Sequence, residues 1–373
     1  MTKPKNSPKH IAIDARVINS STGRYIERLL TYLEQLDSPH HYTVLVRAKD
    51  RDYWQPSKPN FTVKVADYHQ YTTAEQTKFW AFLRKLDADL VHFCMPQQPV
   101  LYRGRSVTTV HDLNLLRITE NEGMSRPVLT VKKFIFRQVL RSVVKHTKLI
   151  ITPTEYTKHD LLKFNKRIPS DKITVTYESA DRLSETPREV KAYKDTQYLL
   201  VVGRAETYKN QRGAIEAHQL LLVGHPNLRL VIVGKRDNTS RRLQTDIESR
   251  GYQNVDFYGF ASDDELAWLY EHCAAYVFPT FMEGFGLPPL EAMRHGAPVA
   301  SSNATCLPEV LGSAASYFNP ADSQQMADVI NQILIHPKHR SELISAGSKQ
   351  AAKYSWHRMA QQTLDIYNKA LNS

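Results

Sequence analysis

The sequence predicts an α/β protein of two doubly wound domains, in which helices cover both faces of a parallel sheet. Three observations support this fold class. The 373 residues are enough for about two domains of ordinary size. Short apolar runs alternate with amphipathic segments along most of the chain, as they do in βαβ units. One charged segment near the middle interrupts this alternation and separates two similar halves.

The first half contains strand-like runs that are apolar without alternation, which is typical of strands buried on both faces. These runs are Ile11–Ile13, Tyr42–Val46, Leu90–Phe93, Ser106–Val110 and Leu149–Thr152. The amphipathic stretches Arg24–Leu36 and Thr130–Lys145 predict helices that cover them.

The second half repeats this organisation. Its strand-like runs are Tyr198–Gly203, Leu228–Val233, Val255–Tyr258, Ala275–Phe278 and Pro298–Ser301. Helices are predicted over Arg212–Leu222 and Glu265–His272. Two sets of about five strands indicate two Rossmann-like domains that face a central cleft, with ligands beyond the carboxyl ends of the strands.

The domain boundaries follow from the interrupted rhythm. The charged segment Ser179–Thr196 contains a proline and lacks an apolar stripe, so we place an interdomain linker at 181–196. The first domain then spans 11–180 and the second spans 197–354. The basic, proline-broken residues 1–10 are predicted to be a disordered tail.

Composition excludes several classes of protein. Hydrophobic residues make up 42% and charged residues 23% of the chain, which fits a globular protein and excludes overall disorder. Cys94, Cys273 and Cys306 lie far apart without CxxC spacing, so we expect neither a disulfide framework nor a cysteine zinc site. The basic start lacks the apolar run of a signal peptide, and no stretch reaches the roughly 18 apolar residues of a membrane span. We therefore expect a cytoplasmic protein.

The chain is basic. Lys and Arg number 49 and Asp and Glu number 38, which gives a net charge of +11. This surplus favours anionic partners such as nucleic acid, phosphorylated substrates or an acidic membrane surface, without choosing among them.

The most informative segment follows the predicted strand Ala275–Phe278. A loop with Gly284 and Gly286 leads into Pro288 and Pro289. Proline suits the first turn of a helix, because the N–H group that it lacks would have no partner within the helix there. The glycines allow a ligand to approach the backbone. The start of the helix offers free N–H groups and the positive end of a dipole to an anion such as phosphate.

Three charged residues add to this segment. Glu291 lies about one turn into the helix, where it can accept hydrogen bonds from sugar hydroxyls; the alternative is a solvated helix residue. Arg204 and Lys209 follow the predicted strand Tyr198–Gly203. Two cations at the carboxyl end of a strand suit a diphosphate, since Arg offers a fork of donors and Lys a point charge. The alternative for this pair is a solvated charged loop.

Together these segments resemble the retaining glycosyltransferases of family 4, which have the GT-B fold, and the resemblance covers nearly the whole chain. Its most specific part is Glu283-Gly284-Phe285-Gly286-Leu287 with Glu291, paired with Gly203-Arg204 and Lys209-Asn210. Weaker matches occur in the family's order at Asp14-Ala15-Arg16, Thr22-Gly23-Arg24-Tyr25, Val110-His111-Asp112-Leu113, Thr152-Pro153-Thr154-Glu155-Tyr156-Thr157, Val233-Gly234-Lys235, Tyr258-Gly259-Phe260 and Leu307-Pro308-Glu309-Val310. The first loop, Ser20-Ser21-Thr22-Gly23, departs from the family because it lacks a preceding Gly-Ile.

The resemblance implies a donor site in the second domain. Arg204 and Lys209 would hold the donor's diphosphate and stabilise the departing nucleotide. Glu283 would contact hydroxyls of the donor sugar, and Glu291 would bind the ribose. Four loop residues would line the donor: Gly284, Phe285, Gly286 and Leu287. Of these, Phe285, Gly286 and Leu287 would offer backbone N–H groups.

The resemblance also implies roles for the first domain, which would be the acceptor side. His111 would lie across the cleft near the donor sugar, and Gly23 would allow the backbone to approach the phosphates. A lone histidine after a strand is often structural, but the adjoining Asp112 and the strand-end position favour catalysis. The last segment, 355–373, would be a helix that crosses back to the first domain, with Trp356 as its anchor.

We expect no bound metal and no cofactor apart from the nucleotide-sugar substrate. Asp87-Ala88-Asp89 matches the Asp-x-Asp pair of metal-dependent sugar transferases, but it precedes Leu90–Phe93, at the end of the strand that faces away from the cleft. We interpret it as the end of a helix and the start of a strand. Preorganised cations would instead stabilise the charge that develops on the leaving group.

The segment Thr130–Lys148 is predicted to be a strongly basic helix. Four basic residues recur at every fourth position and form one stripe. They are Lys133, Arg137, Arg141 and Lys145. The simpler interpretation is a solvated face of a packed helix; the alternative is a surface that attracts anionic lipid or the phosphates of a lipid-linked acceptor at the inner membrane face. No aromatic platform accompanies these charges, which argues against nucleic acid.

The sequence therefore predicts a metal-independent, retaining hexosyltransferase that acts on a glycan or lipid-linked acceptor in surface polysaccharide assembly. GDP-mannose is the favoured donor, because the opening loops and the His111-Asp112-Leu113 segment resemble mannosyltransferases best, and a UDP-hexose is the next candidate. No residue is an obvious nucleophile, so we expect front-face attack assisted by the departing phosphate. Two other classes stay open: a nucleotide-sugar epimerase of the GT-B fold and a non-catalytic basic binding protein.

Overall fold

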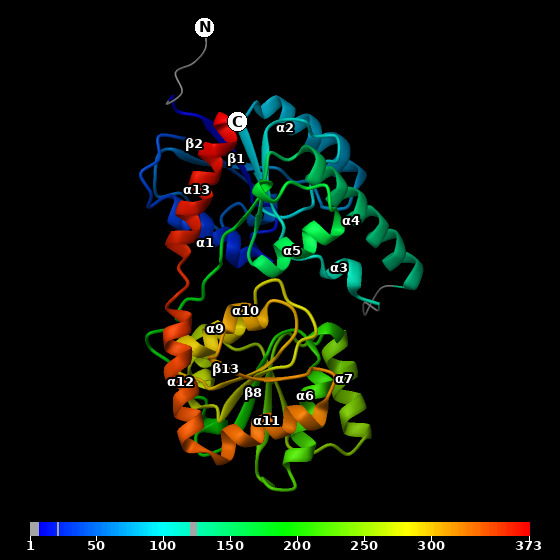
Figure 1. Ribbon diagram of the computed structural model, residues 1–373, viewed down its shortest axis with the longest axis vertical. Helices are drawn as coiled ribbons and strands as arrows, with labels where there is room; N and C mark the ends of the chain where they lie inside the picture. The colour runs from blue at the N-terminus through cyan, green and yellow to red at the C-terminus, as the bar shows by residue number, and fades with distance from the viewer. Residues whose placement is uncertain (1–6, 21, 120–124) are drawn as a thin grey trace. The chain divides into compact units, whose positions relative to one another are not determined.

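The computed structural model describes residues 7–20, 22–119 and 125–373 and divides into two compact units, each built on one parallel sheet (Figure 1). Unit 1 comprises Met1–Arg117, Thr130–Glu178 and Ser355–Ser373. Unit 2 comprises Ile118–Leu129 and Ser179–Tyr354.

Unit 1 contains a seven-stranded sheet with the order β3-β2-β1-β4-β5-β6-β7, in which all neighbours are parallel. The strands are β1 (His10–Asp14), β2 (His41–Val46), β3 (Phe61–Val65), β4 (Leu90–Phe93), β5 (Ser106–Thr109), β6 (Leu149–Thr152) and β7 (Ile173–Val175). The strand order reverses between β1 and β4. This is the topological switch point, beside which doubly wound sheets bind their ligands.

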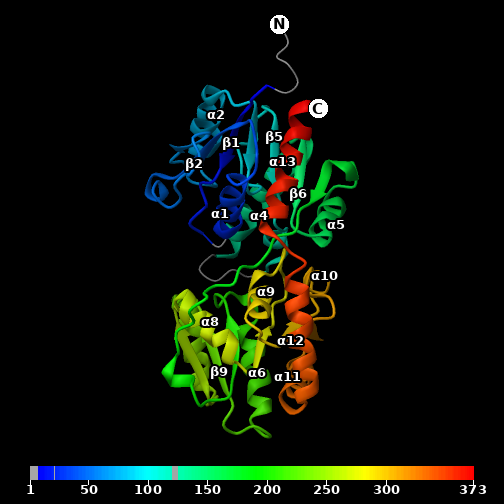
Figure 2. The same cartoon turned by 90° about the vertical axis from the view of Figure 1, so that its left-hand side faces the viewer.

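Helices on both sides of this sheet bury its apolar side chains. They are α1 (Gly23–Leu33), α2 (Trp80–Leu86), α3 (Asn114–Arg117), α4 (Arg126–His146), α5 (Glu155–Phe164) and α13 (Trp356–Asn372), with short turns of helix at Ala48–Asp50, Glu75–Phe79 and Ser170–Lys172. Figures 1 and 2 both show α13, the red helix at the C-terminus, beside α1, and these two helices contact each other. The last segment of the chain is therefore part of unit 1.

Unit 2 contains a six-stranded parallel sheet with the order β10-β9-β8-β11-β12-β13, and its switch point lies between β8 and β11. The strands are β8 (Tyr198–Val202), β9 (Arg229–Val233), β10 (Val255–Gly259), β11 (Ala275–Phe278), β12 (Val299–Ser302) and β13 (Ala315–Phe318). The helices are α6 (Gln211–Leu221), α7 (Asn238–Ser249), α8 (Asp263–His272), α9 (Leu287–Arg294), α10 (Leu307–Leu311), α11 (Ser323–Ile335) and α12 (Pro337–Ala351), with short helical turns at Lys191–Tyr193 and Thr207–Lys209. Fully buried residues such as Leu199, Ile215 and Ile330 join β8, α6 and α11 in one core.

The structure confirms two doubly wound parallel sheets, but the sequence analysis missed β3, β7 and β13. All three are edge strands. An edge strand is covered on fewer sides than a central one, so these three carry more polar residues and lack the continuous apolar run that revealed the central strands; the fourth edge strand, β10, was predicted. In β3, for example, only Phe61 is fully buried, and Thr62 and Lys64 are exposed.

Two predicted boundaries need correction. The segment 181–196, predicted as a linker, belongs to unit 2, where the backbone N–H of Leu183 donates to His295 Nε2 (3.0 Å) and that of Arg188 donates to the carbonyl of Asp264 (3.0 Å). The predicted disordered tail 1–10 is too long, because His10 is the first residue of β1. Residues 1–6 lie outside the described residues.

Helix α13 is fastened to the sheet of unit 1 by a buried hydrogen-bond chain. The Tyr367 hydroxyl lies 2.6 Å from His92 Nδ1, and the other ring nitrogen of His92 lies 2.9 Å from the Thr109 hydroxyl. Burial lowers the pKa of His92 to about 3, so the ring is neutral at physiological pH and uses one nitrogen as donor and the other as acceptor.

We expect Tyr367→Phe to lower the free energy of unfolding by about 1–3 kcal/mol, because it leaves His92 Nδ1 buried without its hydroxyl partner. Urea unfolding monitored by circular dichroism measures this cost. Tyr53→Phe is the matched control, since the Tyr53 side chain is largely exposed. Equal stability of the two variants would contradict the stabilising role assigned to the hydrogen-bond chain.

Candidate active site

The polar residues singled out in the second half of the sequence gather at the switch point of unit 2. Arg204 follows β8, and Lys209 ends the short helical turn after it. Glu283 lies in the loop that follows β11, the neighbour of β8 on the other side of the switch point. Two segments that are distant in sequence thus lie at the edge where doubly wound sheets bind ligands.

The structure brings Lys209 and Glu283 into direct contact. Lys209 Nζ donates to Glu283 Oε1 at 2.7 Å, and the two side chains are 22% and 13% exposed. The backbone of Glu283 is held as well, because its N–H donates to Thr305 Oγ1 (3.0 Å) and its carbonyl accepts from the Cys306 thiol (3.4 Å). The carboxylate is therefore fixed in place beside a cation that remains partly open to solvent.

Arg204 is held more loosely. Its guanidinium lies 3.4 Å from a Glu206 oxygen and 3.3 Å from Asp237 Oδ2, and its side chain is 55% exposed. The N–H of Ser240, and after it Arg204, lower the pKa of Asp237, so this partner is ionised. Exposed ion pairs contribute at most about 1 kcal/mol, so Arg204 can exchange these partners for a phosphate at little cost.

Asn210, next to Lys209, fixes the loop between β8 and α6. Its backbone is left-handed (φ 54°), and its side-chain oxygen accepts from the N–H of Gly213 as the N-cap of α6. Its amide nitrogen donates to the carbonyls of Pro279 (3.1 Å) and Pro320 (2.7 Å). This one side chain thereby joins the Lys209 loop to the loop after β11 that carries Glu283.

Helix α9 begins one residue earlier than the prolines suggested, at Leu287, with Gly286 as its N-cap. Gly286 has a φ of +91°, and a Cβ atom there would lie 2.8 Å from the Leu307 side chain, so only glycine fits without strain. Pro288 and Pro289 take the next two helical positions and have no N–H. The N–H groups predicted to face a donor, those of Phe285, Gly286 and Leu287, all precede the prolines.

The remaining residues of the predicted donor loop are largely buried. Phe285 packs edge-on against Tyr354, with ring centroids 5.6 Å apart. Gly284 lies between Glu283 and Phe285 in the same loop. Glu291 is only 3% exposed, so the alternative of a solvated helix residue is wrong.

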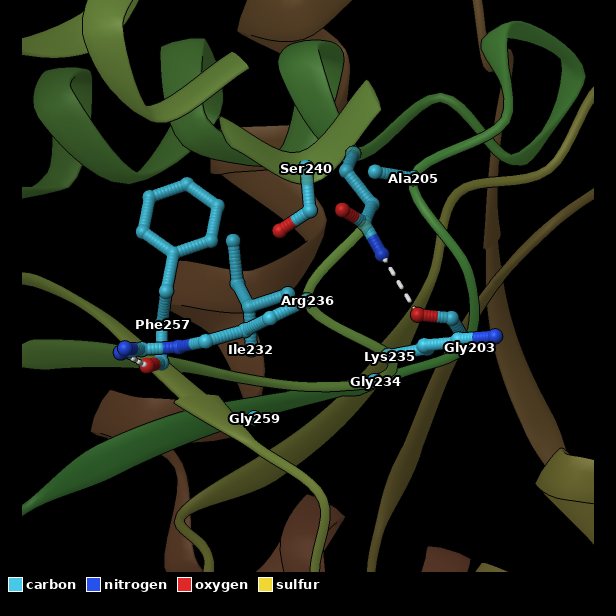
Figure 3. A pocket seen from close by; sticks show the side chains of 10 residues that line it. Gly203, Ala205, Ile232, Gly234, Lys235, Arg236, Ser240, Phe257 and Gly259 are labelled. Carbon is cyan, nitrogen blue, oxygen red and sulfur yellow. Dashed lines mark hydrogen bonds between the residues drawn. The ribbon is translucent and has the colours of Figure 1, made fainter. Parts of the chain in front are cut away.

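A small pocket lies beside this site, between the carboxyl ends of β8, β9 and β10 (Figure 3). Gly203, Gly234 and Gly259 line it, and in Figure 3 the side-chain amide that donates to the Gly203 carbonyl is that of Gln211 (2.9 Å). Its volume is about 10 Å³, enough for about one water molecule.

In unit 1, His111 follows β5 and Gly23 begins α1. His111 Nε2 lies 2.9 Å from the Cys94 carbonyl, and Nδ1 lies 3.2 Å from Glu178 Oε1. A Cβ atom on Gly23 would lie 1.7 Å from the Ile18 carbonyl oxygen. The glycine is thus explained by close packing within its own loop, and this packing does not test the predicted phosphate contact.

The Asp87-Ala88-Asp89 segment lies where the sequence analysis placed it. Asp87 is the left-handed C-cap of α2, and Asp89 Oδ2 accepts from the backbone N–H of His10 at the start of β1 (2.8 Å). Among the described residues, no group of three or more His, Cys, Asp and Glu side chains is arranged to hold a metal ion.

Sequence reasoning missed the residues that partner the site. Asp237, Thr305 and Glu178 each pair with a predicted site residue from a different loop. For Asp237 and Thr305 a signal existed, because each follows a predicted strand of unit 2 by a few residues and so lies at the same sheet edge. Glu178 follows the edge strand β7, which the sequence analysis did not identify.

Comparison with known proteins shows the family of the chain. Residues 22–181 match the family model described as Glycosyltransferase Family 4, and residues 184–350 match that of Glycosyl transferases group 1. The chain is 32% identical over 275 residues to O-antigen chain mannosyltransferase B of Escherichia coli, which covers 70% of both proteins.

Solved structures show the same fold at low sequence identity. Sucrose-phosphate synthase of Thermosynechococcus elongatus superimposes with a TM-score of 0.76 at 18% identity, over 97% of this chain and 98% of that chain. Anabaena Alr3699/HepE in complex with UDP and glucose gives a TM-score of 0.74 at 16% identity, over 97% and 100%. The fold of the chain is GT-B.

We expect Asn210→Asp to lower the free energy of unfolding by about 1–3 kcal/mol, because a carboxylate cannot donate to the two proline carbonyls. Differential scanning calorimetry measures the loss. Asn238→Asp is the control, since this residue lies in the exposed first turn of α7. An Asn210→Asp protein as stable as the control would contradict the bridging role.

Proposed function

Because the chain belongs to the family 4 glycosyltransferases and is a hexosyltransferase, we propose that it transfers mannose from GDP-mannose to a sugar hydroxyl of a glycan or lipid-linked acceptor. The observation that carries this proposal is the Lys209–Glu283 pair at the switch point of unit 2, with Arg204 in the same loop as Lys209. The name of the relative, O-antigen chain mannosyltransferase B, supports mannose as the sugar and surface polysaccharide assembly as the setting.

The donor binds by replacing partners that the site already has. Its diphosphate takes the place of Glu206 and Asp237 at Arg204 and of Glu283 at Lys209. Glu283 then accepts hydrogen bonds from hydroxyls of the sugar. The ribose binds at Glu291, and the loop over Gly284, Phe285, Gly286 and Leu287 covers the phosphates and the sugar.

The reaction retains the configuration of the anomeric carbon. The acceptor oxygen bonds to that carbon on the face from which the diphosphate leaves, the bond from the carbon to the phosphate oxygen breaks, and the acceptor proton passes to that departing oxygen. Arg204 and Lys209 stabilise the negative charge that develops there, and one such preorganised donor contributes roughly 3–4 kcal/mol. Cys306, close to Glu283, is no nucleophile, because burial and then Glu283 raise the pKa of its thiol.

The two cations also make the reaction independent of metal ions and of any cofactor other than the donor substrate. In transferases that use a metal, the ion neutralises the leaving diphosphate. Here the two positive charges of Arg204 and Lys209 neutralise the leaving diphosphate instead. His111 of unit 1 contributes a further group to the transfer, and unit 1 binds the acceptor.

We expect purified protein in EDTA to convert GDP-mannose and a mannose-terminated acceptor into an α-linked product, read directly by proton NMR as the first-formed anomer. Glu283→Gln should lower kcat by at least about a hundredfold, as the loss of a transition-state contact does. Glu342→Gln, at an exposed position of α12, is the control.

Other outcomes separate the alternatives. In a thermal-shift panel of GDP, UDP, dTDP and ADP with their sugars, the nucleotide that binds the folded state raises the melting temperature most. A larger shift with UDP-sugars would replace the donor, an inverted anomer would refute retention, and turnover without acceptor would indicate an epimerase. If Glu283→Gln leaves nucleotide-sugar binding intact and neither the wild type nor the variant shows turnover, the result would indicate a binding protein.

Helix α4 gives the enzyme a surface for an anionic membrane, where a lipid-linked acceptor resides. The basic stripe defined above, Lys133, Arg137, Arg141 and Lys145, lies on this helix. Beside it Val131, Phe134 and Ile135 are exposed, Phe134 by 59%. Basic residues attract anionic lipid by about 1 kcal/mol each, and exposed apolar side chains can enter the interface. None of the helices in the described part of the chain is long and apolar enough to cross a membrane.

We expect the protein to sediment with vesicles that contain phosphatidylglycerol and not with pure phosphatidylcholine vesicles. Removing two charges of the stripe together, by Arg137→Gln and Arg141→Gln, should reduce partitioning of the protein onto the anionic vesicles roughly 30-fold, which corresponds to about 2 kcal/mol. Lys338→Gln with Lys349→Gln on α12 is the matched control. Equal binding to neutral and anionic vesicles would contradict the membrane surface.

A further inference from the structure

Both ring nitrogens of His111 face groups that only accept hydrogen bonds. Nε2 lies 2.9 Å from the carbonyl oxygen of Cys94, and Nδ1 lies 3.2 Å from Glu178 Oε1. A neutral imidazole has one donor and one acceptor nitrogen, so it can satisfy only one of these partners unless the carboxyl group is protonated. A doubly protonated ring satisfies both.

We infer that Glu178 is a positioning residue that holds His111 as a doubly protonated imidazolium, so that His111 serves transfer as a fixed cation and not as a base. The ion pair itself is a property of unit 1. Its part in turnover rests on the proposed function.

The charges around the ring favour this state. Tyr25 packs edge-on against His111 from α1, with ring centroids 4.8 Å apart, and burial raises the pKa of its hydroxyl well above 10. Burial likewise keeps the Cys94 thiol protonated and the His92 ring, on β4, neutral. Among the described residues, the charges that act on the ring are those of Glu178 and Asp112, and both are acidic.

The net effect follows from these opposed contributions. Burial alone lowers the pKa of His111, because it disfavours the charged ring. The hydrogen bond and charge of Glu178, the Cys94 carbonyl and Asp112 act against burial and raise the pKa above 6.5. Glu178 is itself only 5% exposed, so the carboxylate also depends on the ring for its counter-charge.

A ring in this state has no lone pair, so it cannot take the proton of the acceptor hydroxyl. That proton goes to the departing phosphate oxygen, as in the proposed reaction. About a sixth of the His111 side chain (16%) is exposed, which leaves part of the charged ring at the surface of unit 1. A fixed positive charge of this kind stabilises negative charge on a leaving diphosphate.

We expect NMR titration of protein labelled at histidine, with the His111 signal assigned through His111→Asn, to give a pKa above 6.5 for His111. Glu178→Gln keeps an oxygen that can accept from Nδ1–H but removes the charge, so the pKa of His111 should fall. Glu185→Gln, a change at an 83% exposed carboxylate, should leave it unchanged. Since folding raises the pKa of His111, the pair stabilises unit 1 fully below pH 6.5 and loses this effect as pH rises through the folded value.

The kinetic arm uses the same variants. Relative to the wild type, the kcat of Glu178→Gln should fall more at pH 8 than at pH 6. At pH 8 the fall should be about tenfold for each unit by which the pKa of His111 decreases. Glu178→Asp, which keeps the charge, should restore the wild-type pH profile, and KM for the donor should not change. Circular dichroism confirms that each variant is folded.

The two arms fail separately. A His111 pKa at or below 6.5, or one that Glu178→Gln does not move, overturns the inference even if transfer occurs. Loss of kcat by the same factor at every pH also overturns it, because a merely structural role predicts that result. Absence of transfer with every donor, alongside the predicted titration, overturns the proposed function and leaves the ion pair in place.

Discussion

Strands that are buried on both faces leave no place for an unpaired charge inside the sheet, and this constraint organises both units. Along β8 and β11 nearly every side chain is fully buried. The first charged groups along the chain after these strands, Arg204 and Glu283, therefore lie in the loops beyond them. Because all strands of a sheet are parallel, these loops converge on one edge, and the reversal of strand order between β8 and β11 opens a place between them.

A second regularity is that each of the predicted basic residues has an acidic partner within its own unit. Lys209 pairs with Glu283, Arg204 with Asp237 and His111 with Glu178. The degree of burial separates the pairs: Arg204 is half exposed and held weakly, whereas Glu178 is almost completely buried. A diphosphate can replace the partners of Arg204 at little cost, but breaking the His111 pair would leave a buried charge unpaired. The first kind of pair suits ligand exchange, and the second suits fixed orientation.

The sequence was sufficient for the central strands, for the two-unit organisation and for placing Arg204, Lys209 and Glu283 after the carboxyl ends of strands, while their role in donor binding stays a prediction. Continuous apolar runs and strand-end positions reveal such features without any tertiary information. The edge strands β3, β7 and β13 were missed because partial exposure mixes polar residues into them. The partners of the site were missed for another reason: Thr305 and Glu283, or His111 and Glu178, are brought together only by the order of strands in the sheet.

The prolines of α9 show how such local detail changes the chemistry. A helix that begins at Leu287 and continues with Pro288 and Pro289 has given up two of the N–H groups that could hold a phosphate. The dipole of the helix remains, but directed hydrogen bonds to an anion must come from elsewhere. Side-chain cations can supply them, and Arg204 and Lys209 lie at the same sheet edge. In the proposed function, the paired prolines therefore leave a larger share of the charge stabilisation in unit 2 to the two cations and the acids that hold them in place.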